Sequence, residues 1–271
     1  MRVYGFNVGY AFLTLGCAAI IFTAWSASAL IITPFLIVIE GRNRYADVAM
    51  VNDEDVIKNY EVNWKFYKMQ EGTGKYLASK TSTTEFDLTK NIVFTPKRAQ
   101  LGPRSMQKIR LGLRIKGEPP PPGDYRAHLE LREADLAGGP DDPNQKGMRV
   151  SVNVNVGFTV PVVYRVGEPD VTAEIGDVTP RINPETKKIE VSVPVTLSES
   201  PYGVLGHLMI YYKGDKVGDI RNANIFPEAR HRTFNVGLKA QQLSGGSLEV
   251  VLVDYKDKDK IYAQKTIPVG Q

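Results

Sequence analysis

The sequence predicts an all-β protein of two β-sandwich domains that follow an N-terminal signal peptide. Two observations support this prediction. Short runs that alternate or are rich in β-branched residues recur through the chain after the first 30 residues, and Gly, Pro, Asn and Asp separate them. Almost none of that part has the 3.6-residue apolar period of an amphipathic helix. Many short strands separated by turn signals are typical of sandwiches, and the first domain is predicted to be immunoglobulin-like.

The first 29 residues have the pattern of a secretory signal peptide. Arg2 supplies a positive n-region, an apolar h-region follows, and Ala27 and Ala29 occupy the small-residue positions of an A-x-A cleavage site. We expect cleavage after Ala29. An uncleaved anchor is the alternative, because apolar residues resume in residues 30–39 (LIITPFLIVI). A threonine and a proline interrupt that run, however, so it is better explained as the first strand of the mature domain.

Cysteine content and charge exclude several classes of protein. Cys17 is the only cysteine and lies in the apolar h-region, so the mature chain is expected to have no disulfide. Burial alone must then stabilise about 240 residues, which is enough for two domains. The formal charge of +4 is spread along the chain without a basic cluster, so nucleic-acid binding has little electrostatic support. No stable membrane span is expected after signal cleavage.

The first domain is predicted to span residues 30–166. Its expected strands are YADVAMV (45–51), YEVNWKFYKM (60–69), NIVFTP (91–96), QKIRLGLRI (107–115) and YRAHLELRE (125–133). A last strand, MRVSVNVNVGFTVPVVYRV (148–166), alternates for much longer than the usual five or six residues. An apolar stripe of this length raises the question of what covers it.

The second domain is predicted to span residues 167–271, after a boundary at RVGEPDVT (165–172). Its expected strands are KKIEVSVPVTL (187–197), GHLMIYYKGDKVGDI (206–220), RTFNVGL (232–238), SLEVVLVDY (247–255) and IYAQKTIPV (261–269). We interpret KDKDK (256–260) as a solvated hairpin turn, because its charges alternate between two strand-like runs. GTGKY (72–76) lacks the spacing of a phosphate-binding loop and also predicts a hairpin turn.

A search for catalytic chemistry finds almost nothing. The three histidines, His128, His207 and His231, are far apart and have no zinc-type spacing. No G-x-S-x-G motif is present, and a mature chain without cysteine has no thiol chemistry. The sequence therefore predicts a protein that is not an enzyme and has no metal or cofactor. His128 alternates onto a polar strand face with Arg126 and Glu130, either as an exposed face or as part of a polar pocket.

Four segments together resemble a known family. ADVAMVND (46–53), IVFTPKRAQLGPRSMQKIRL (92–111), PPGDYRAHLEL (121–131) and VPVVYR (160–165) follow the order seen in the first domain of PapD-like periplasmic chaperones of the pilus chaperone–usher pathway. Asn52 at the end of a strand and Gly123 at the start of another are among the matching details. The second domain resembles a divergent, non-P-pilus subset of these chaperones more loosely.

The resemblance implies a periplasmic chaperone that caps incomplete pilin or fimbrial subunits and delivers them to an outer-membrane usher. In that family the last strand of the first domain inserts beside the incomplete subunit, and its apolar side chains fill the subunit's groove. The donor residues implied here are Val152, Val154, Val156 and Phe158, with Val150 and Val160 as outer members.

One departure from the family concerns the site that holds the subunit's terminal carboxylate. P-pilus members use an arginine in the first strand and a lysine near the end of the donor strand, and those positions align with Leu36 and Pro161. Neither residue can bind a carboxylate. Arg126, His128 and Arg165 are the candidates for a relocated basic pocket, because a fork of donors binds a carboxylate best.

A second hypothesis is a secreted structural or adhesive protein of two sandwich domains without chaperone activity. Its long strand would pack inside its own fold or cover a second copy, as in a self-capping homodimer. The two hypotheses differ in the surroundings of the apolar stripe, because a donor strand is an edge strand whose apolar face is only partly covered.

Overall fold

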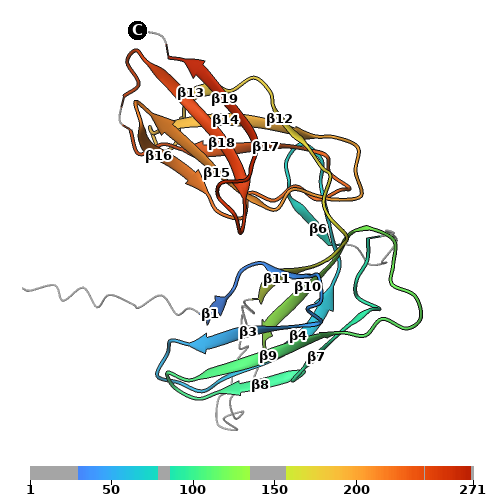
Figure 1. The fold of residues 1–271 in the computed structure, drawn as a ribbon. Helices are drawn as coiled ribbons and strands as arrows, with labels where there is room; N and C mark the ends of the chain where they lie inside the picture. Colours follow the sequence, from blue (N-terminus) through green and yellow to red (C-terminus); the bar gives the residue numbers. More distant parts are fainter. Residues whose placement is uncertain (1–29, 79–85, 135–156, 241, 270–271) are drawn as a thin grey trace, which may run out of the picture.

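The computed structural model of the chain describes residues 30–78, 86–134, 157–240 and 242–269. These residues form strands, turns and loops, and none of them is helical. Figure 1 shows two β-sandwiches, one above the other, formed in order by the two halves of the chain. The predicted fold class, two β-sandwich domains, is thereby confirmed. The predicted signal peptide and its Cys17 lie outside the described residues.

Two sheets form the first sandwich, with strand orders β1–β3–β9–β7 and β2–β11–β10–β4–β8. The strands are β1 (Leu30–Thr33), β2 (Ile37–Glu40), β3 (Tyr45–Asn52), β4 (Lys58–Lys65), β7 (Ile92–Thr95), β8 (Arg98–Leu101), β9 (Met106–Leu113), β10 (Gly123–Glu133) and β11 (Gly157–Val166). The order β1–β3–β9–β7 corresponds to strands A–B–E–D of an immunoglobulin domain, and β11–β10–β4 corresponds to strands G–F–C. Alternating residues from both sheets form one core between them.

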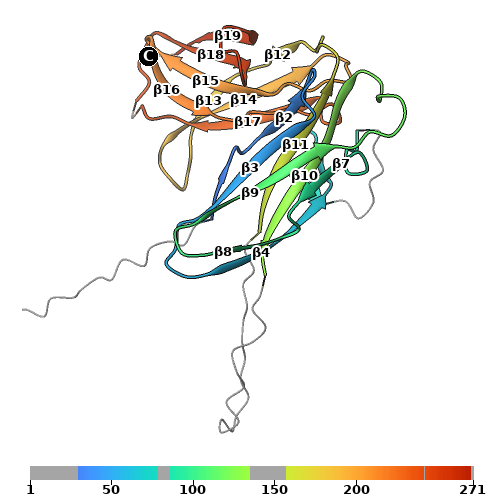
Figure 2. The same cartoon turned by 60° about the horizontal axis from the view of Figure 1, so that its bottom comes forward.

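The apolar run at residues 30–39 forms two strands in different sheets rather than the single strand expected. β1 pairs with β3, and β2 pairs in parallel with β11. Proline has no N–H to donate to a sheet ladder, so the chain leaves the first sheet at Pro34 and joins the second after it. Figure 2 shows β2, β11 and β10 side by side, running toward the second domain.

A hairpin arm projects from the first domain onto the second. It consists of β5 (Tyr67–Met69) and β6 (Tyr76–Ala78), so the turn predicted at GTGKY is confirmed. At its tip, the Gly72 N–H donates to the His231 carbonyl (2.8 Å), and the Thr233 N–H donates to the Gly72 carbonyl (2.8 Å). The arm thereby extends the sheet edge of the second domain.

The second sandwich also has two sheets. In one, β14 pairs with β12 and β13 on one side and β17 on the other, and in the second the order is β16–β15–β18–β19. The strands are β12 (Ala173–Ile175), β13 (Thr179–Ile182), β14 (Ile189–Leu197), β15 (Gly206–Tyr212), β16 (Asp215–Ile220), β17 (His231–Gly237), β18 (Ser247–Asp254) and β19 (Ile261–Pro268). KDKDK joins β18 to β19 as the predicted hairpin turn. The segment predicted as the domain boundary (165–172) begins in the last two residues of β11 and ends directly before β12.

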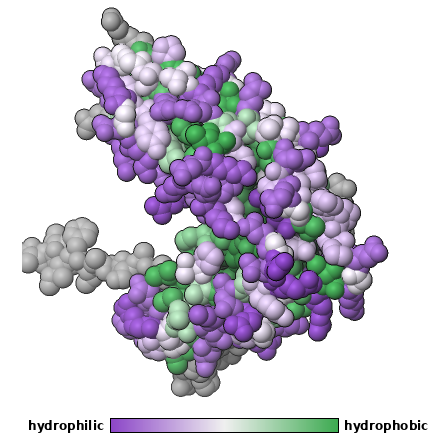
Figure 3. Space-filling model, viewed as in Figure 1, coloured by the Kyte–Doolittle hydropathy of each residue, from purple (hydrophilic) through white to green (hydrophobic). Residues whose placement is uncertain are grey.

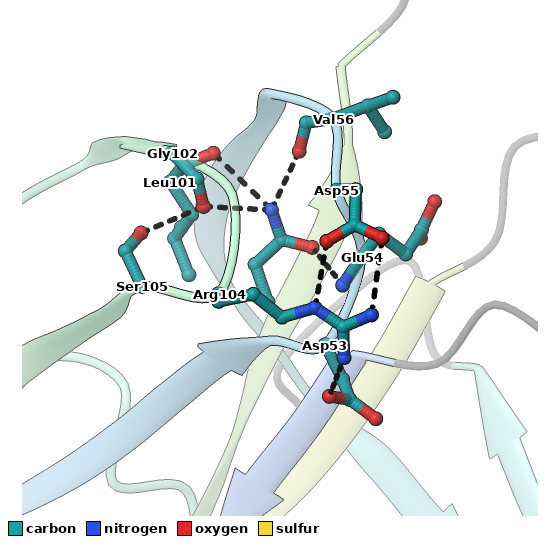
Figure 4. Close-up of polar contacts among 9 residues, drawn as sticks. Asp53, Glu54, Asp55, Val56, Leu101, Gly102, Arg104 and Ser105 are labelled. Atoms are coloured by element: carbon teal, nitrogen blue, oxygen red, sulfur yellow. Dashed lines mark hydrogen bonds and ion pairs between the residues drawn. The ribbon is translucent and has the colours of Figure 1, made fainter.

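Loops at the far end of the first domain are tied together by one buried amide. The Asn52 Nδ2 donates to the carbonyls of Val56 (2.7 Å) and Gly102 (2.8 Å), and its Oδ1 accepts from the Glu54 N–H (3.1 Å). Around it, the Arg104 guanidinium pairs with two aspartates of the β3–β4 turn (Figure 4). The asparagine that the family pattern places at this strand end therefore joins two turns.

Candidate functional site

The last strand of the first domain has one side that is only half covered. β10 pairs antiparallel with β11 from Gly157 to Val166. On the other side, β2 pairs only with Val162–Arg165. Within the described residues, the β2 side of Gly157–Pro161 therefore has no paired strand, and this segment is called the open edge below.

Three outer strands elsewhere carry features that oppose the addition of another strand. β13 contains Pro180, which lacks an N–H, and β8 begins with the exposed Arg98. β19 carries Lys265, whose Nζ donates to the Gly176 carbonyl of the neighbouring sheet. Prolines and charged residues are the usual protection of sheet edges. The open edge has no charged residue, and only its last position is a proline.

The described part of the apolar stripe packs into its own domain. Val160 is 1% exposed and belongs to the first domain's core, and Phe158 is partly buried against the same core. Along this part of β11, the backbone edge is open while these two side chains point inward. Four of the predicted donor residues lie outside the described residues, and their role stays a prediction: Val150, Val152, Val154 and Val156.

Arg126 lies on the outer face of β10 and binds a carboxylate of the second domain. Its guanidinium forms an ion pair with Glu228, and the side chains of both residues are buried. The Nη2 also donates to the Tyr67 carbonyl of the arm (2.8 Å), and the guanidinium carbon lies 3.8 Å from the centre of the Phe226 ring. Burial alone raises the pKa of Glu228, but Arg126 and the Met69 N–H outweigh it and hold that pKa below its usual value.

Arg165 forms a second buried ion pair in the next cross-strand row on the same outer face. Its Nε and Nη2 donate to the two carboxylate oxygens of Asp124 at 2.7 and 2.8 Å, which is the bidentate geometry. The second domain completes this site, because the Gly203 carbonyl accepts from Arg165 (3.1 Å) and the Gly203 N–H donates to Asp124 (3.0 Å). The pair thus joins the two domains at the point where the chain passes between them.

His128 is buried beneath the hairpin arm. It is 1% exposed, and the rings of Tyr67 and Tyr76 pack edge-on against it at centroid distances of 5.1 and 5.0 Å. Neither ring nitrogen has a hydrogen-bond partner. Burial, together with the charge of Arg126, lowers the pKa of His128 to about 3, so the imidazole is neutral at physiological pH.

The three predicted pocket residues therefore lie on one face but do not form a free basic pocket. Arg165, Arg126 and His128 occupy successive rows of the β10–β11 pair, as the alternation predicts. The expectation of an exposed strand face at His128 is wrong, because the arm and the second domain cover it. Internal carboxylates bind both guanidinium groups, so a client carboxylate would have to displace one of them. Binding of a client by these residues stays a prediction.

An apolar cluster fills the region around the positions aligned with the family's carboxylate anchor. Leu36 packs together with Val38 and Val163 of the first domain. From the second domain and the arm, Met69, Leu205, Phe226, Ala229 and Tyr255 complete the cluster. Pro161 lies directly across from the buried His128 on the same outer face. This cluster gives a physical reason why an apolar residue stands at position 36.

Sequence reasoning missed the partners that the second domain and the arm contribute. Glu228 and Phe226 lie in a loop without periodicity, and nothing in the local pattern indicates that they reach Arg126. Asp124 ends the proline-rich segment 117–124, which the sequence predicts as an extended or polyproline II loop. The sequence signal was a run of charged residues and one histidine on the outer face of β10. Hydrophobic alternation places these side chains on one face but does not identify their partners.

A cleft of about 620 Å³ lies between the two domains on the side of the proline-rich loop. Phe86, Tyr125 and Pro201 contribute to its walls, and Arg230 and Glu199 form an ion pair (3.3 Å) at its rim. The Tyr125 hydroxyl already donates to the Pro121 carbonyl (2.8 Å). The described residues that line the cleft include no histidine, cysteine or lysine.

Neither metal ligation nor membrane crossing has structural support in the described residues. No group of three or more His, Cys, Asp or Glu side chains among them is placed to hold a metal ion. The same part of the chain contains no helix long and apolar enough to cross a membrane.

Comparisons with known proteins give matches in structure only. No family model and no curated protein matches the sequence. A structure from a chaperone–tip adhesin complex of CFA/I fimbriae biogenesis is similar, with a TM-score of 0.46, 14% identity, and coverage of 89% of this chain and 98% of that one. Also similar is the Salmonella enterica SafA pilin–SafB chaperone complex, with a TM-score of 0.44, 11% identity, and coverage of 91% of this chain and 99% of that one. The CsuC–CsuE chaperone–tip adhesion subunit complex of Acinetobacter baumannii has a TM-score of 0.43, 11% identity, and coverage of 90% of this chain and 99% of that one. Each is a pilus or fimbrial chaperone complex.

Proposed function

We propose that the chain is a non-enzymatic assembly chaperone that holds an incomplete β-sandwich subunit by strand addition along residues 150–161. The clients would be pilin or fimbrial subunits, and an outer-membrane usher would receive them. The immunoglobulin order of the first domain and the resemblance of its strand motifs support this proposal. The compartment would be the periplasm, reached through the signal peptide predicted at residues 1–29.

The single observation that carries the proposal is the open edge of β11. A strand with unpaired N–H and C=O groups is a template for another chain, and soluble proteins usually protect such edges. β8, β13 and β19 carry a charge or an internal proline that opposes strand addition, whereas Gly157–Pro161 carries no charge and has a proline only at its last position. Main-chain hydrogen bonds to this edge would fix the register of a client strand.

The predicted energies are compatible with capture of a client. Burying the three apolar side chains Val152, Val154 and Val156 in a client groove is worth about 1.5–3 kcal/mol each, or about 4.5–9 kcal/mol together. Phe158 already packs against the core of its own domain. Association costs about 4–15 kcal/mol. Backbone pairing along the open edge must therefore contribute to a stable complex.

Co-expression with a pilin-like subunit encoded by a neighbouring gene, followed by pull-down, tests the proposal. The double variant Val154→Asp/Val156→Asp places charges in the apolar stripe and should abolish capture. The matched control Asn153→Asp/Asn155→Asp adds the same charge one position off the stripe and should retain capture. Undiminished capture by the stripe variant contradicts the donor role.

A second candidate function is a structural or adhesive two-domain protein without chaperone activity. The observation that favours it is the position of Val160 and Phe158, whose side chains pack into their own domain. On this hypothesis the open edge pairs with a second copy of the chain, and purified protein is a self-capping homodimer. Failure of both wild type and control to capture any co-expressed subunit favours this alternative.

A further inference from the structure

β2 limits how far an added strand can extend along β11. It pairs in parallel with β11 from Val162 onward, so a strand added at the open edge meets the beginning of β2 after Pro161. The added strand must end there or turn away. The residues at this point are therefore the first that the end of the added strand meets.

Apolar side chains occupy this junction. Leu36 and Pro161 each precede the first paired residues, Ile37 and Val162, by one position, and both alternate onto the outer face of the sheet. Phe35 directly precedes Leu36 at the bend between β1 and β2, and its side chain is 62% exposed. The residues Phe35, Leu36 and Pro161 are called the junction shelf below. Figure 3 shows apolar residues gathered on the first domain where it faces the second across a hollow.

The ionisable side chains nearest to the junction shelf along the strands are either uncharged or already paired with a carboxylate. His128, directly across from Pro161, is uncharged because burial lowers its pKa to about 3. Arg126, in the next row, binds Glu228 of the second domain. Lys65 lies beyond His128 on β4, with its Nζ 3.9 Å from a Glu130 oxygen.

We propose that the junction shelf receives the end of the partner's added strand and selects an apolar, uncharged end rather than a free terminal carboxylate or amine. The inference rests on the proposed strand addition and names the class of client strand that the site accepts. A charged terminus placed on apolar side chains loses hydration without gaining a partner. An apolar residue in the same place adds to the buried cluster of Leu36 and Val163.

Four synthetic nine-residue peptides of alternating valine and threonine test this inference by isothermal titration calorimetry. They carry acetylated or free N-termini combined with amidated or free C-termini. A strand parallel to β11 brings its C-terminus to the junction shelf, and an antiparallel one brings its N-terminus. We expect the charged form of one terminus, and of that terminus alone, to bind about tenfold more weakly, which corresponds to 1.4 kcal/mol.

Placing a charge at the exposed Phe35 should reverse the preference for an uncharged peptide end. If the C-terminus is the sensitive end, Phe35→Arg should abolish the preference or invert it toward the free carboxylate; if it is the N-terminus, Phe35→Glu should do so for the free amine. Ile182→Arg, at an exposed apolar position of β13 in the second domain, should leave the preference unchanged. Circular dichroism of the variants confirms that they are folded.

The outcomes separate this inference from the proposed function. Equal binding of all four peptides, or tighter binding of a charged end to the wild type, overturns the junction shelf as a selector while strand addition stands. Absence of binding by every peptide contradicts addition at the open edge itself, and the inference falls with it. A penalty that Phe35 substitution leaves intact also overturns the shelf.

Discussion

His128 makes the stability of the protein depend on pH in a window where few other groups titrate. Its pKa is lowered to about 3 in the folded protein and is about 6.5 when the chain is unfolded. The unfolded state therefore binds the extra proton between these values, and stability present above pH 6.5 is lost as the pH falls toward 3. A pH of 5 is 1.5 units below the pKa of the imidazole in the unfolded chain, so the free energy of unfolding falls by about 2 kcal/mol.

The variant His128→Phe isolates this effect. Phenylalanine keeps an aromatic ring beside Tyr67 and Tyr76 and removes the two ring nitrogens that have no partner. Urea unfolding of wild type and variant at pH 8 and pH 5 gives the free energies of unfolding. We expect the wild type to lose about 2 kcal/mol more than the variant on acidification. Glu228 and Asp254, whose pKa values are lowered, contribute mainly below about pH 4.5 and are common to both proteins.

The result that refutes this reasoning is an equal loss of stability in wild type and variant between pH 8 and pH 5. Such a result means that the imidazole is protonated in the folded protein, and thus that the arm does not seal His128 from water. The description of His128 as an uncharged neighbour of the junction shelf would then also be wrong.

The remaining predictions concern the contacts that fix the two domains and the loops. Glu228→Gln leaves a buried guanidinium without its anion and should destabilise the protein by about 3–5 kcal/mol in urea unfolding, and a change below about 1 kcal/mol contradicts a buried pair. Asn52→Ala removes the amide that joins two turns and should cost about 2–3 kcal/mol, with a matching fall in the thermal midpoint. Gly167→Ala should destabilise by at least about 1 kcal/mol more than Gly214→Ala. Both glycines have positive φ (83° and 88°), but only the first would place a Cβ 2.6 Å from the Tyr202 hydroxyl, so equal losses contradict the close packing of the domains.

The strands were predictable where the chain alternates over several residues. β3, β9, β10, β14 and β18 follow the runs that the sequence indicated. β8, β12 and β13 have only three or four residues and few apolar side chains, so their pairing depends on neighbours and not on their own pattern. The division of the first apolar run at Pro34 into two sheets required the missing N–H of that proline to be considered along with its hydropathy.

The outer face of β10 was predictable in orientation but not in burial. Alternation places Arg126 and His128 on one side of the strand, as observed. Their environment depends on the hairpin arm and on the loop that carries Glu228, and both are distant in the sequence. Long-range cover of this kind leaves no periodic signal in the strand that it covers. The same limit applies to Leu36, whose apolar character became understandable only from the cluster around it.

Hydrogen exchange in a complex with a co-purified pilin-like subunit tests the central claim most directly. Within residues 150–160, the alternate backbone amides that face the open side of the strand should exchange more slowly in the complex than in the free protein, because strand addition gives them hydrogen-bond partners. The protected edge at Arg98–Leu101 serves as the internal control and should exchange equally in both states. A stable complex in which residues 150–160 exchange as fast as in the free protein would contradict the account.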